Sequence, residues 1–382
     1  MKALFYRIYA FLFNLSARLF PLRENRAAFV SMHNENFNDS LGEVMREFQA
    51  RGFDCVFITR RDLDVKLQNV FRVFSFFFKK SRLLATSKYV FLNDNFLPMA
   101  FLNFKKQTVV TQLWHAEGAF KRFGLSIEQP ESLRKNEISA NSRLSFVVCS
   151  SKNCVPVYAQ AFGIEKSRIL PLGAPRADYL LKKENGEKAK KRLLERFPSL
   201  GGKKLLLYAP TFRATPEENK TLLSHFDFEL FKREFGEEYA VLVRLHPQIH
   251  EEAKLSPLVF DVTEYGDVRD LILACDVLVT DYSSICMSFS LLSKKTVFFA
   301  FDEEKYTAER NFYFDYDTEL PGEIAKTTEE LVELVRAEFD EEKNERFRKR
   351  NFDFLDCESS RRVADFLTGK TSGDGLEHPS KT

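Results

Sequence analysis

Residues 276–292 read DVLVTDYSSICMSFSLL, an apolar run that turns polar and then takes on a helical pattern. The run 277–280 predicts a buried β-strand, and the apolar residues after 284 predict a helix that follows directly. Asp281, Ser283 and Ser284 lie at the junction, where the free N–H groups at the start of a helix attract phosphate. Serine is also a common helix N-cap, so a purely structural role is the alternative. A strand leading straight into a helix is the repeating unit of parallel α/β folds.

The same alternation continues on both sides of this stretch. Short β-type apolar runs are separated by segments of helical periodicity, which predicts mostly parallel sheets covered by helices. A segment rich in Lys, Glu and Arg at 182–204 divides the strands into two sets, so we expect two Rossmann-like domains facing each other across a cleft. The expected strands are 27–32, 55–59, 89–93, 108–113, 146–149 and 169–172 in the first set, and 205–209, 241–245, 259–262, 277–280 and 297–301 in the second.

The composition narrows the classes of function. The 382 residues carry a formal net charge of only +2, which gives no support for a nucleic-acid partner. The six cysteines form no CxxC pair and no Cys/His zinc spacing, so we expect free, mostly buried thiols in a reducing compartment. The DxD pairs at 62–64 and 315–317 follow no strand edge in a glycine-containing phosphate loop, so we expect no metal site there. The sequence contains no P-loop, GxGxxG or GxSxG motif.

The N-terminal residues have the pattern of a helix that lies on a membrane surface. Apolar residues form one stripe at helical spacing, opposite Arg7, Asn14 and Arg18. A Phe-rich run at 71–78 ends in cations that suit anionic lipid headgroups. An ordinary docked helix is the alternative for the first segment, and a buried helix is the alternative for the second. A signal peptide is a weaker alternative for the first segment, because Asn14 interrupts its apolar stretch and no clear small-residue cleavage site follows. No stretch reaches the roughly 18 apolar residues that span a membrane. The residues expected at the membrane are Leu4, Ile8, Phe11, Leu12, Leu15, Leu19, Lys79, Lys80 and Arg82.

Polar residues that follow the expected strands are candidates for chemistry, because ligands bind beyond the carboxyl ends of parallel strands. His115 can take a proton from an attacking hydroxyl near neutral pH, and a structural histidine is the equal alternative. Arg244 and His246 share one face and suit a pyrophosphate whose charge grows on the leaving group, unless Arg244 pairs with a carboxylate. The other strand-end candidates are Glu117, Gly118, Lys121, Arg176, Thr211, Arg213, Thr280 and Asp281.

Several of these segments together resemble the CDP-glycerol:poly(glycerophosphate) glycerophosphotransferase family, the teichoic-acid primases and polymerases. The resemblance covers about residues 108–325 in the right order, and residues 1–107 only loosely. The matching segments are 112–115, 173–178, 208–213, 244–247 and 276–284, continued by 310–315 and 321–322.

The resemblance implies a GT-B architecture and a monotopic protein on the cytoplasmic face of the cell membrane, with no metal or other cofactor. It implies that an acceptor hydroxyl attacks the β-phosphorus of CDP-glycerol and expels CMP. The expected organisation is an interfacial helix at 1–26, an acceptor domain at 27–181, a linker at 182–204, a CDP-donor domain at 205–345, a closing helix at 346–368 and a disordered tail at 369–382.

The resemblance also implies roles for single residues. His115 matches the proposed general base, and Arg244 with His246 matches the pair that holds and neutralises the donor phosphates. The chain departs from the family at Ala116, where many members have Gly, and at Ser288, where the family usually places an Asp near the donor's glycerol hydroxyls. The remaining matches are Ser283 and Ser284 to a phosphate-binding turn, and Thr211 and Arg213 to a second side of the nucleotide pocket.

The leading hypothesis is transfer of glycerol phosphate from CDP-glycerol to a polyprenyl-pyrophosphate-linked disaccharide, or to its glycerophosphate-primed form. Polymerases of the family often carry an additional domain for which this chain has no room, so we expect a primase. Ser288 leaves CDP-ribitol as an alternative donor, and a short polymerase is a further alternative. A GT-B nucleotide-sugar glycosyltransferase or epimerase, and a non-catalytic protein of the lipid surface, are the hypotheses from other classes.

Overall fold

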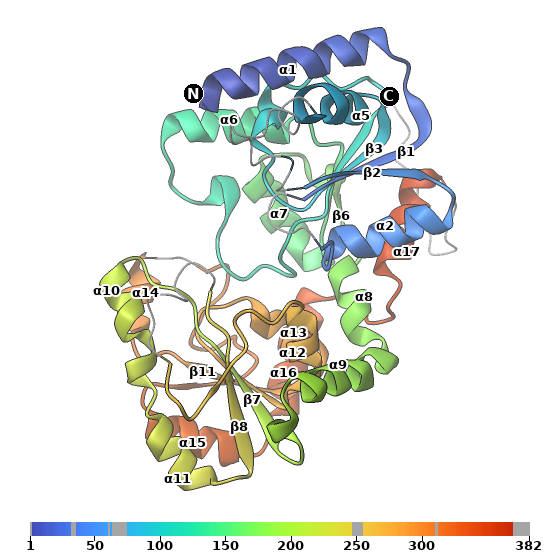
Figure 1. The fold of residues 1–382 in the computed structure, drawn as a ribbon. Coiled ribbons are helices and arrows are strands. Elements are labelled where there is room, and N and C mark those ends of the chain that lie inside the picture. Colours follow the sequence, from blue (N-terminus) through green and yellow to red (C-terminus); the bar gives the residue numbers. More distant parts are fainter. Residues whose placement is uncertain are drawn as a thin grey trace. The chain divides into compact units, whose positions relative to one another are not determined.

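The computed structural model describes residues 2–31, 36–59, 62, 75–246, 255–309 and 312–369. The chain forms two compact units: unit 1 comprises Met1–Asp178 and Phe352–Thr382, and unit 2 comprises Tyr179–Asn351. Each unit contains one six-stranded sheet of parallel strands, with helices packed on it (Figure 1). The α/β fold with two parallel sheets, predicted from the sequence, is confirmed.

The sheet of unit 1 has the strand order β2-β1-β3-β4-β5-β6. β1 and β3 are neighbours in this sheet, and the chain passes from β1 to β2 on one side and from β3 to β4 on the other, so the connections after β1 and β3 diverge. β1 begins at Arg23 rather than at residue 27, and Arg26 in its first half pairs with Asp54 of β2 at 2.6 Å. The strands are β1 (Arg23–Val30), β2 (Asp54–Ile58), β3 (Ser87–Leu92), β4 (Val109–Gln112), β5 (Phe146–Val148) and β6 (Ile169–Leu170).

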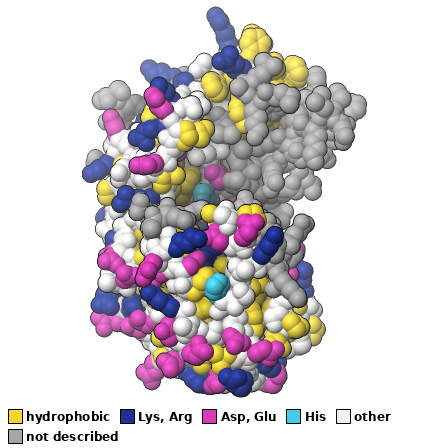
Figure 2. All heavy atoms as spheres, turned by 90° about the vertical axis from the view of Figure 1, so that its left-hand side faces the viewer, with side chains coloured by type: hydrophobic (Ala, Val, Ile, Leu, Met, Phe, Trp, Pro, Cys, Tyr) yellow, Lys and Arg dark blue, Asp and Glu magenta, His cyan; other side chains and the backbone are white. Residues whose placement is uncertain are grey.

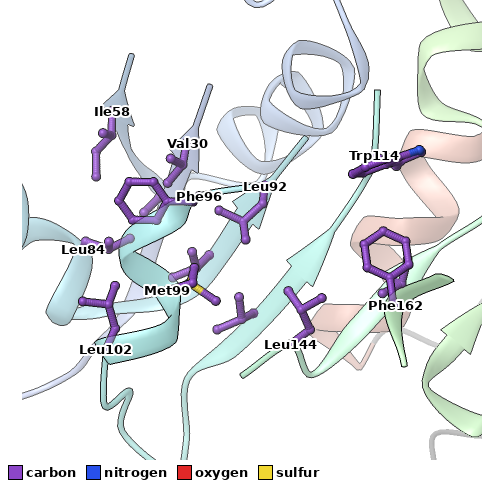
Figure 3. Packing of buried hydrophobic residues seen from close by; sticks show 14 of the residues in the cluster. Val30, Ile58, Leu84, Leu92, Phe96, Met99, Leu102, Trp114, Leu144 and Phe162 are labelled. Atoms are coloured by element: carbon purple, nitrogen blue, oxygen red, sulfur yellow. The ribbon is translucent and has the colours of Figure 1, made fainter. Parts of the chain in front are cut away.

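Alternate residues of the unit 1 strands point into two separate cores, as expected for a parallel sheet that is covered on both faces. Ala28 and Val30 of β1 join one core, part of which is drawn in Figure 3, whereas Ala27 and Phe29 join the other. The first core includes side chains of α1 (Lys2–Leu19), η1 (Ser75–Lys80), α5 (Ser81–Ala85), η2 (Leu97–Phe101) and α7 (Val155–Phe162). The second includes side chains of α2 (Ser40–Ala50) and α17 (Ser359–Thr368), which lie side by side in Figure 1.

Helix α1 is docked on unit 1 through one of two apolar sides. Tyr9, Phe13 and Ala17, spaced four residues apart, are buried in the first core. Tyr9 stacks on Phe76 with the ring centroids 4.5 Å apart, and Phe77 is buried beside it. The expectation that Phe76 and Phe77 face a membrane is therefore wrong, because the core of unit 1 takes both rings.

The other side of α1 remains exposed, together with part of the cationic segment. Leu12 packs against the core, and the side chain of Leu4 lies outside the described part of the chain, as do residues 71–74. Lys80 is paired with Asp62 at 3.1 Å, so it is not available to headgroups in this structure. No helix in the described ranges is long and apolar enough to cross a membrane. The exposed side chains of the expected membrane surface are Ile8, Phe11, Leu15, Leu19, Lys79 and Arg82.

The sheet of unit 2 has the order β9-β8-β7-β10-β11-β12. Counted within the unit this is 3-2-1-4-5-6, the strand order of dinucleotide-binding Rossmann domains. The chain leaves β7 and β10 in opposite directions, and ligands in such sheets bind beyond the carboxyl ends of these two strands. The strands are β7 (Lys204–Ala209), β8 (Tyr239–Val243), β9 (Phe260–Asp261), β10 (Val277–Thr280), β11 (Lys295–Phe299) and β12 (Glu323–Ala325).

The helices of unit 2 also cover both faces of its sheet. Helices α11 (Phe228–Phe235) and α15 (Thr328–Arg336) share a core with one face, and α12 (Val268–Ala274) and α13 (Ile285–Leu291) contact strands with buried side chains. On the face drawn in Figure 2, acidic side chains are interspersed with Lys and Arg over unit 2, in line with the small net charge. The α-helices not yet named are α6 (Glu131–Asn141), which belongs to unit 1, and α8 (Pro175–Leu181), α9 (Lys183–Arg196), α10 (Pro216–Thr221), α14 (Glu303–Glu309) and α16 (Glu341–Asn351).

The segment at 346–368, expected as one closing helix, forms the end of α16 and the whole of α17. α17 belongs to unit 1, where Asp178 caps it from a distant part of the sequence. The Asp178 carboxylate accepts the N–H groups of Ser359 and Ser360, at 3.0 and 2.7 Å, and the Ser360 hydroxyl at 2.6 Å. The first turn of α17 thus obtains partners for its free N–H groups, although its own N-cap Glu358 supplies no side-chain bond.

We expect Asp178→Ala to lower the free energy of unfolding by roughly 1–3 kcal/mol, because two N–H groups of a buried helix end lose their acceptor. Calorimetry should show a lower melting temperature for the transition that includes unit 1. Glu195→Ala is the control, since the Glu195 side chain is 63% exposed in unit 2, and it should stay within about 0.5 kcal/mol of wild type. Equal melting temperatures for the two variants would show that Asp178 does not stabilise α17.

Candidate functional site

The loop after β4 carries His115, and contacts on both sides of this residue fix the loop. Trp114 has a φ of +58°, a left-handed conformation that is uncommon for a residue with a side chain. Its N–H donates to Gln112 Oε1 at 3.0 Å, and its ring stacks on Phe123 at 4.9 Å between centroids. Such strained residues persist where neighbouring contacts over-determine them, and they concentrate at functional sites. The His115 side chain is 51% exposed beside the buried Trp114.

A carboxylate from the neighbouring strand end lies beside this histidine. Asp94 follows β3, and its Oδ2 is 3.5 Å from His115 Nδ1. Gln112 Nε2 donates to the Asp94 carbonyl oxygen at 3.2 Å, which ties the two loops together. A carboxylate near one ring nitrogen favours the tautomer whose other nitrogen can accept a proton, which is how a general base is oriented. Asp94 was not among the residues singled out from the sequence, although it follows the strand expected at 89–93.

The residues that follow His115 also hold this loop in place. Glu117 is 5% exposed, and its Oε1 lies 3.6 Å from Arg176 Nε, while Arg176 Nη1 donates to the His115 carbonyl oxygen at 3.1 Å. Gly118 has a φ of +63°, and its N–H donates to the Ser150 hydroxyl at 3.0 Å. Glu117, Gly118 and Arg176 thus hold the backbone that presents His115.

In unit 2 the loops after β7 and β10 are bonded to each other at the point where the strand order reverses. The Thr211 N–H donates to Asp281 Oδ1 at 2.8 Å, and the Thr280 hydroxyl donates to the Ala209 carbonyl oxygen at 2.7 Å. The Thr211 hydroxyl is buried and has no hydrogen-bond partner among the described residues. A buried hydroxyl without a partner at this place is a group that a bound ligand can satisfy.

Arg213 connects these two loops to a third. Its guanidinium is 5% exposed, and it donates to Asp281 Oδ2 at 2.9 Å and to both oxygens of Asp302, after β11, at 2.6 and 3.0 Å. Although burial works against its charge, Asp281 and Asp302 raise the pKa of Arg213 above its ordinary value. The Tyr282 hydroxyl donates to Asp302 Oδ1 at 2.9 Å, and burial raises the pKa of Tyr282. Arg213 therefore positions the three loops, and Asp302 was not singled out from the sequence.

The two serines at the start of α13 lie directly beyond Asp281. Ser283 and Ser284 are half-buried, and Ser283 Oγ accepts the N–H of Ile285 at 3.4 Å. The Ser284 side chain makes no capping hydrogen bond to this seven-residue helix. Ser288, one helical turn further on, is buried within α13. The two hydroxyls at the turn are thus partly accessible, whereas the Ser288 hydroxyl faces protein.

Arg244 and His246 follow β8, one residue apart. Arg244 Nη1 donates to the carbonyl oxygens of Val262 and Tyr265, each at 3.0 Å, so the carboxylate partner weighed from the sequence is replaced by two backbone acceptors. Burial lowers the pKa of the Arg244 guanidinium and of the His246 imidazole below their ordinary values. The ring of His246 lies 4.7 Å from that of Phe212.

The described residues contain no group of three or more His, Cys, Asp or Glu side chains placed to hold a metal ion. In the second DxD pair, Asp315 Oδ1 accepts the N–H groups of Asp317 and Thr318 at 3.0 and 3.3 Å, so it closes a turn. Asp62 of the first pair accepts the Thr59 N–H at 2.9 Å, and Asp64 lies outside the described residues. The six cysteines are free, and burial raises the pKa of Cys275 to about 12.

Comparison with known proteins places this arrangement in a family. The model of the CDP-glycerol:poly(glycerophosphate) glycerophosphotransferase family matches residues 11–369. The chain belongs to this family. The chain is similar to the teichoic acid ribitol-phosphate primase of Bacillus spizizenii, with 32% identity over 94% of this chain and 95% of the relative. It is 33% identical to the teichoic acid poly(ribitol-phosphate) polymerase of the same organism over 91% of this chain, but spans only 57% of that relative.

A relative with the other alditol and a solved structure complete the comparison. The chain is 30% identical to the teichoic acid glycerol-phosphate primase of Bacillus subtilis, over 75% of this chain and 74% of the relative. Its fold is similar to that of the wall teichoic acid polymerase TagF, with a TM-score of 0.78 and 22% identity over 96% of this chain and 95% of the TagF chain. The family predicted from the sequence is thus confirmed, as is a GT-B-like α/β fold.

The residues singled out from the sequence form two groups in this transferase. In unit 1, His115, Glu117, Gly118 and Arg176 lie together, and Lys121 follows half-buried. The unit 2 group is held by direct bonds between the loops after β7, β10 and β11, and it consists of Thr211, Arg213, Thr280 and Asp281 with Ser283 and Ser284 adjacent in sequence. The roles of these residues toward substrates remain predictions.

We expect Arg213→Ala to destabilise unit 2 by about 3–5 kcal/mol, because two carboxylates that face one buried guanidinium lose their countercharge. Arg233→Ala is the matched control: the Arg233 side chain is 71% exposed, and its loss should change stability by less than about 0.5 kcal/mol. Urea unfolding followed by tyrosine fluorescence and calorimetry measures both. If Arg213→Ala and Arg233→Ala had the same free energy of unfolding and the same melting temperature, Arg213 would not be the residue that holds the three loops.

Proposed function

We propose that this transferase moves glycerol phosphate from CDP-glycerol to a lipid-linked acceptor in teichoic acid synthesis and releases CMP. The single observation that carries the proposal is the pairing of His115 with Asp94 on fixed loops of unit 1, in a chain that the family model matches over residues 11–369. A partly exposed histidine with an orienting carboxylate is the arrangement that a general base requires.

In the proposed reaction the acceptor hydroxyl attacks the β-phosphorus of CDP-glycerol. A new P–O bond forms to the acceptor, the proton of the hydroxyl passes to His115, and the P–O bond to CMP breaks. Asp94 stabilises the imidazolium that results. The donor diphosphate is assigned to unit 2, where Ser283, Ser284, Arg244 and His246 supply hydrogen-bond donors beyond the strand ends. The proposal requires no metal or other cofactor.

Ribitol phosphate from CDP-ribitol is the second candidate. Among the relatives described above, the ribitol-phosphate primase matches over nearly the whole of both chains, which favours this donor. Ser288, expected from the sequence beside the alditol, is buried within α13 and therefore does not decide between the two donors.

The first experiment gives the purified protein CDP-glycerol or CDP-ribitol with a lipid-linked disaccharide in detergent, and follows CMP release and product mass. We expect one alditol-phosphate increment with one of the donors, and the same rate in EDTA. His115→Asn should lower kcat by about 10²–10⁴-fold, and Asp94→Asn should lower kcat by a smaller factor with the KM for the donor unchanged.

His378→Asn serves as the control and should retain the wild-type rate. A ladder of increments would make the enzyme a polymerase, and a loss of rate in EDTA would contradict the absence of a metal. If the protein released no CMP from either donor, or released UDP from a nucleotide sugar, the proposal would be contradicted and the sugar-transfer alternative would be favoured.

We place the enzyme at the cytoplasmic face of the membrane as a peripheral protein. Its α1 helix is docked through Tyr9 and Phe13, yet it leaves Phe11 66% exposed and Leu19 64% exposed on its other side. An exposed apolar ridge near the exposed cations Lys79 and Arg82 suits the boundary between headgroups and acyl chains.

The double variant Phe11→Asp/Leu15→Asp should bind vesicles of phosphatidylglycerol and phosphatidylcholine roughly tenfold or more weakly, because two apolar side chains no longer leave water. Leu355→Asp is the control, since Leu355 is 44% exposed but lies outside α1. Co-sedimentation measures the bound fraction. Equal binding by the double variant and the control would remove α1 as the membrane contact.

A further inference from the structure

A pocket of about 190 Å³ lies in unit 1 between η2 and α6, beyond the ends of β3 and β4. The Ser139 hydroxyl of α6 donates to the Ala100 carbonyl oxygen of η2 at 3.1 Å, which joins the two walls. The floor is apolar and is formed by Leu92, Phe96, Met99 and Leu144, of which Figure 3 shows the first three close to one another. A pocket of this size is smaller than the about 300–1,000 Å³ of a site for a drug-sized ligand, so it takes part of a substrate and not a whole nucleotide.

The polar lining of this pocket is rich in carboxamides and contains no cation. Among the described residues that line it there is no Lys or Arg, whereas two carboxylates are present. Carboxylates repel phosphate, so the lining excludes an anionic group. Carboxamides can both donate and accept hydrogen bonds, as hydroxyl-rich ligands require. The polar lining residues are Asp94, Asn95, Gln112, Gln129, Asn136, Glu137 and Asn141.

One of these carboxamides lacks a partner. Asn141 is 4% exposed, and its Nδ2 makes no hydrogen bond to any described residue. Buried donors are almost always paired, and leaving one unpaired is costly. The neighbouring Glu137 is already engaged, since its Oε2 accepts from Gln129 Nε2 at 2.7 Å. Asn141 is therefore the donor that an entering ligand oxygen can satisfy after a small rotation of the side chain.

The pocket is also connected to the proposed base. Asp94 lines it and lies 3.5 Å from His115 Nδ1, and Gln112 lines it while accepting the Trp114 N–H of the histidine loop at 3.0 Å. A ligand in the pocket thus touches the same two side chains that orient His115. An apolar floor below a ring of hydrogen-bonding groups matches a sugar, which has a C–H face and peripheral hydroxyls.

We infer that this pocket binds a neutral sugar ring of the acceptor and so places its reactive end next to His115. That the ligand is the acceptor rests on the proposed function. That the ligand is an uncharged sugar rests on the lining of the pocket. The donor's alditol phosphate is excluded by its charge, because the carboxylates Asp94 and Glu137 lie in the lining.

Direct binding tests this inference without turnover. Ligand-observed NMR on the full chain would use chitobiose, a neutral disaccharide whose acetamido and hydroxyl groups match carboxamides, and glycerol 3-phosphate as the anionic comparison. Leu133 lines the pocket and is 54% exposed, so Leu133→Trp should narrow the entrance without disturbing the core and weaken chitobiose binding at least tenfold. Ile138→Trp is the matched control on the same helix, since Ile138 is 46% exposed and does not line the pocket.

Asn141→Leu should weaken chitobiose binding about three- to tenfold through loss of one hydrogen bond, with Asn103→Leu, an exposed carboxamide of unit 1, as its control. Binding that survives Leu133→Trp unchanged, absent binding by wild type, or tighter binding of glycerol 3-phosphate would each overturn the inference. In turnover, both pocket variants should raise the KM for the acceptor and leave the KM for the donor unchanged. If the wild type bound chitobiose but released no CMP from either donor, the proposed function would be overturned and the inference about the pocket would stand, because chitobiose binding is measured separately.

Discussion

The strand-end loops of unit 2 depend on one buried ion group, in which Arg213 lies between Asp281 and Asp302. Parallel strands end at one edge of a sheet, so their loops bring polar groups together, but nothing in the strands themselves fixes the loops to each other. Arg213 does this for the loops after β7, β10 and β11 at once. A planar guanidinium with several donors suits such a task better than an ammonium group, because it can bind two carboxylates in fixed directions.

The proposed base in unit 1, His115, is fixed by different contacts. His115 follows Trp114, whose left-handed backbone is stabilised by the Gln112 side chain and by stacking on Phe123. The buried Trp114 holds the backbone, while the side chain of the next residue remains 51% exposed. Strain that would destabilise a loop elsewhere is here compensated by packing, and the result is a histidine with a set orientation toward Asp94.

Sequence patterns predicted the strands and the residues that follow them, because burial in a parallel sheet leaves continuous apolar runs. They did not reveal Asp94 or Asp302, since both follow strands whose neighbours in the sheet become known only from the strand order. Helix α1 was predicted as one-sided, yet Tyr9 and Phe13 form a second apolar face that packs inward. A helical stripe shows that a helix has an apolar face, but not which partner covers it.

Under the proposed function, the two units bind ligands of different charge. In unit 2 the residues assigned to the diphosphate are Ser283, Ser284, Arg244 and His246, whereas the pocket of unit 1 is lined by carboxamides and carboxylates around an apolar floor. An anionic donor and an uncharged sugar therefore have no reason to compete for the same place. If the pocket takes the acceptor as proposed, substitutions at Asn141 or Leu133 alter the choice of acceptor and leave His115 in place, because neither residue belongs to the loop of His115 or to the loops of unit 2. This division is one physical route by which a family with a common transfer reaction can serve different polymers.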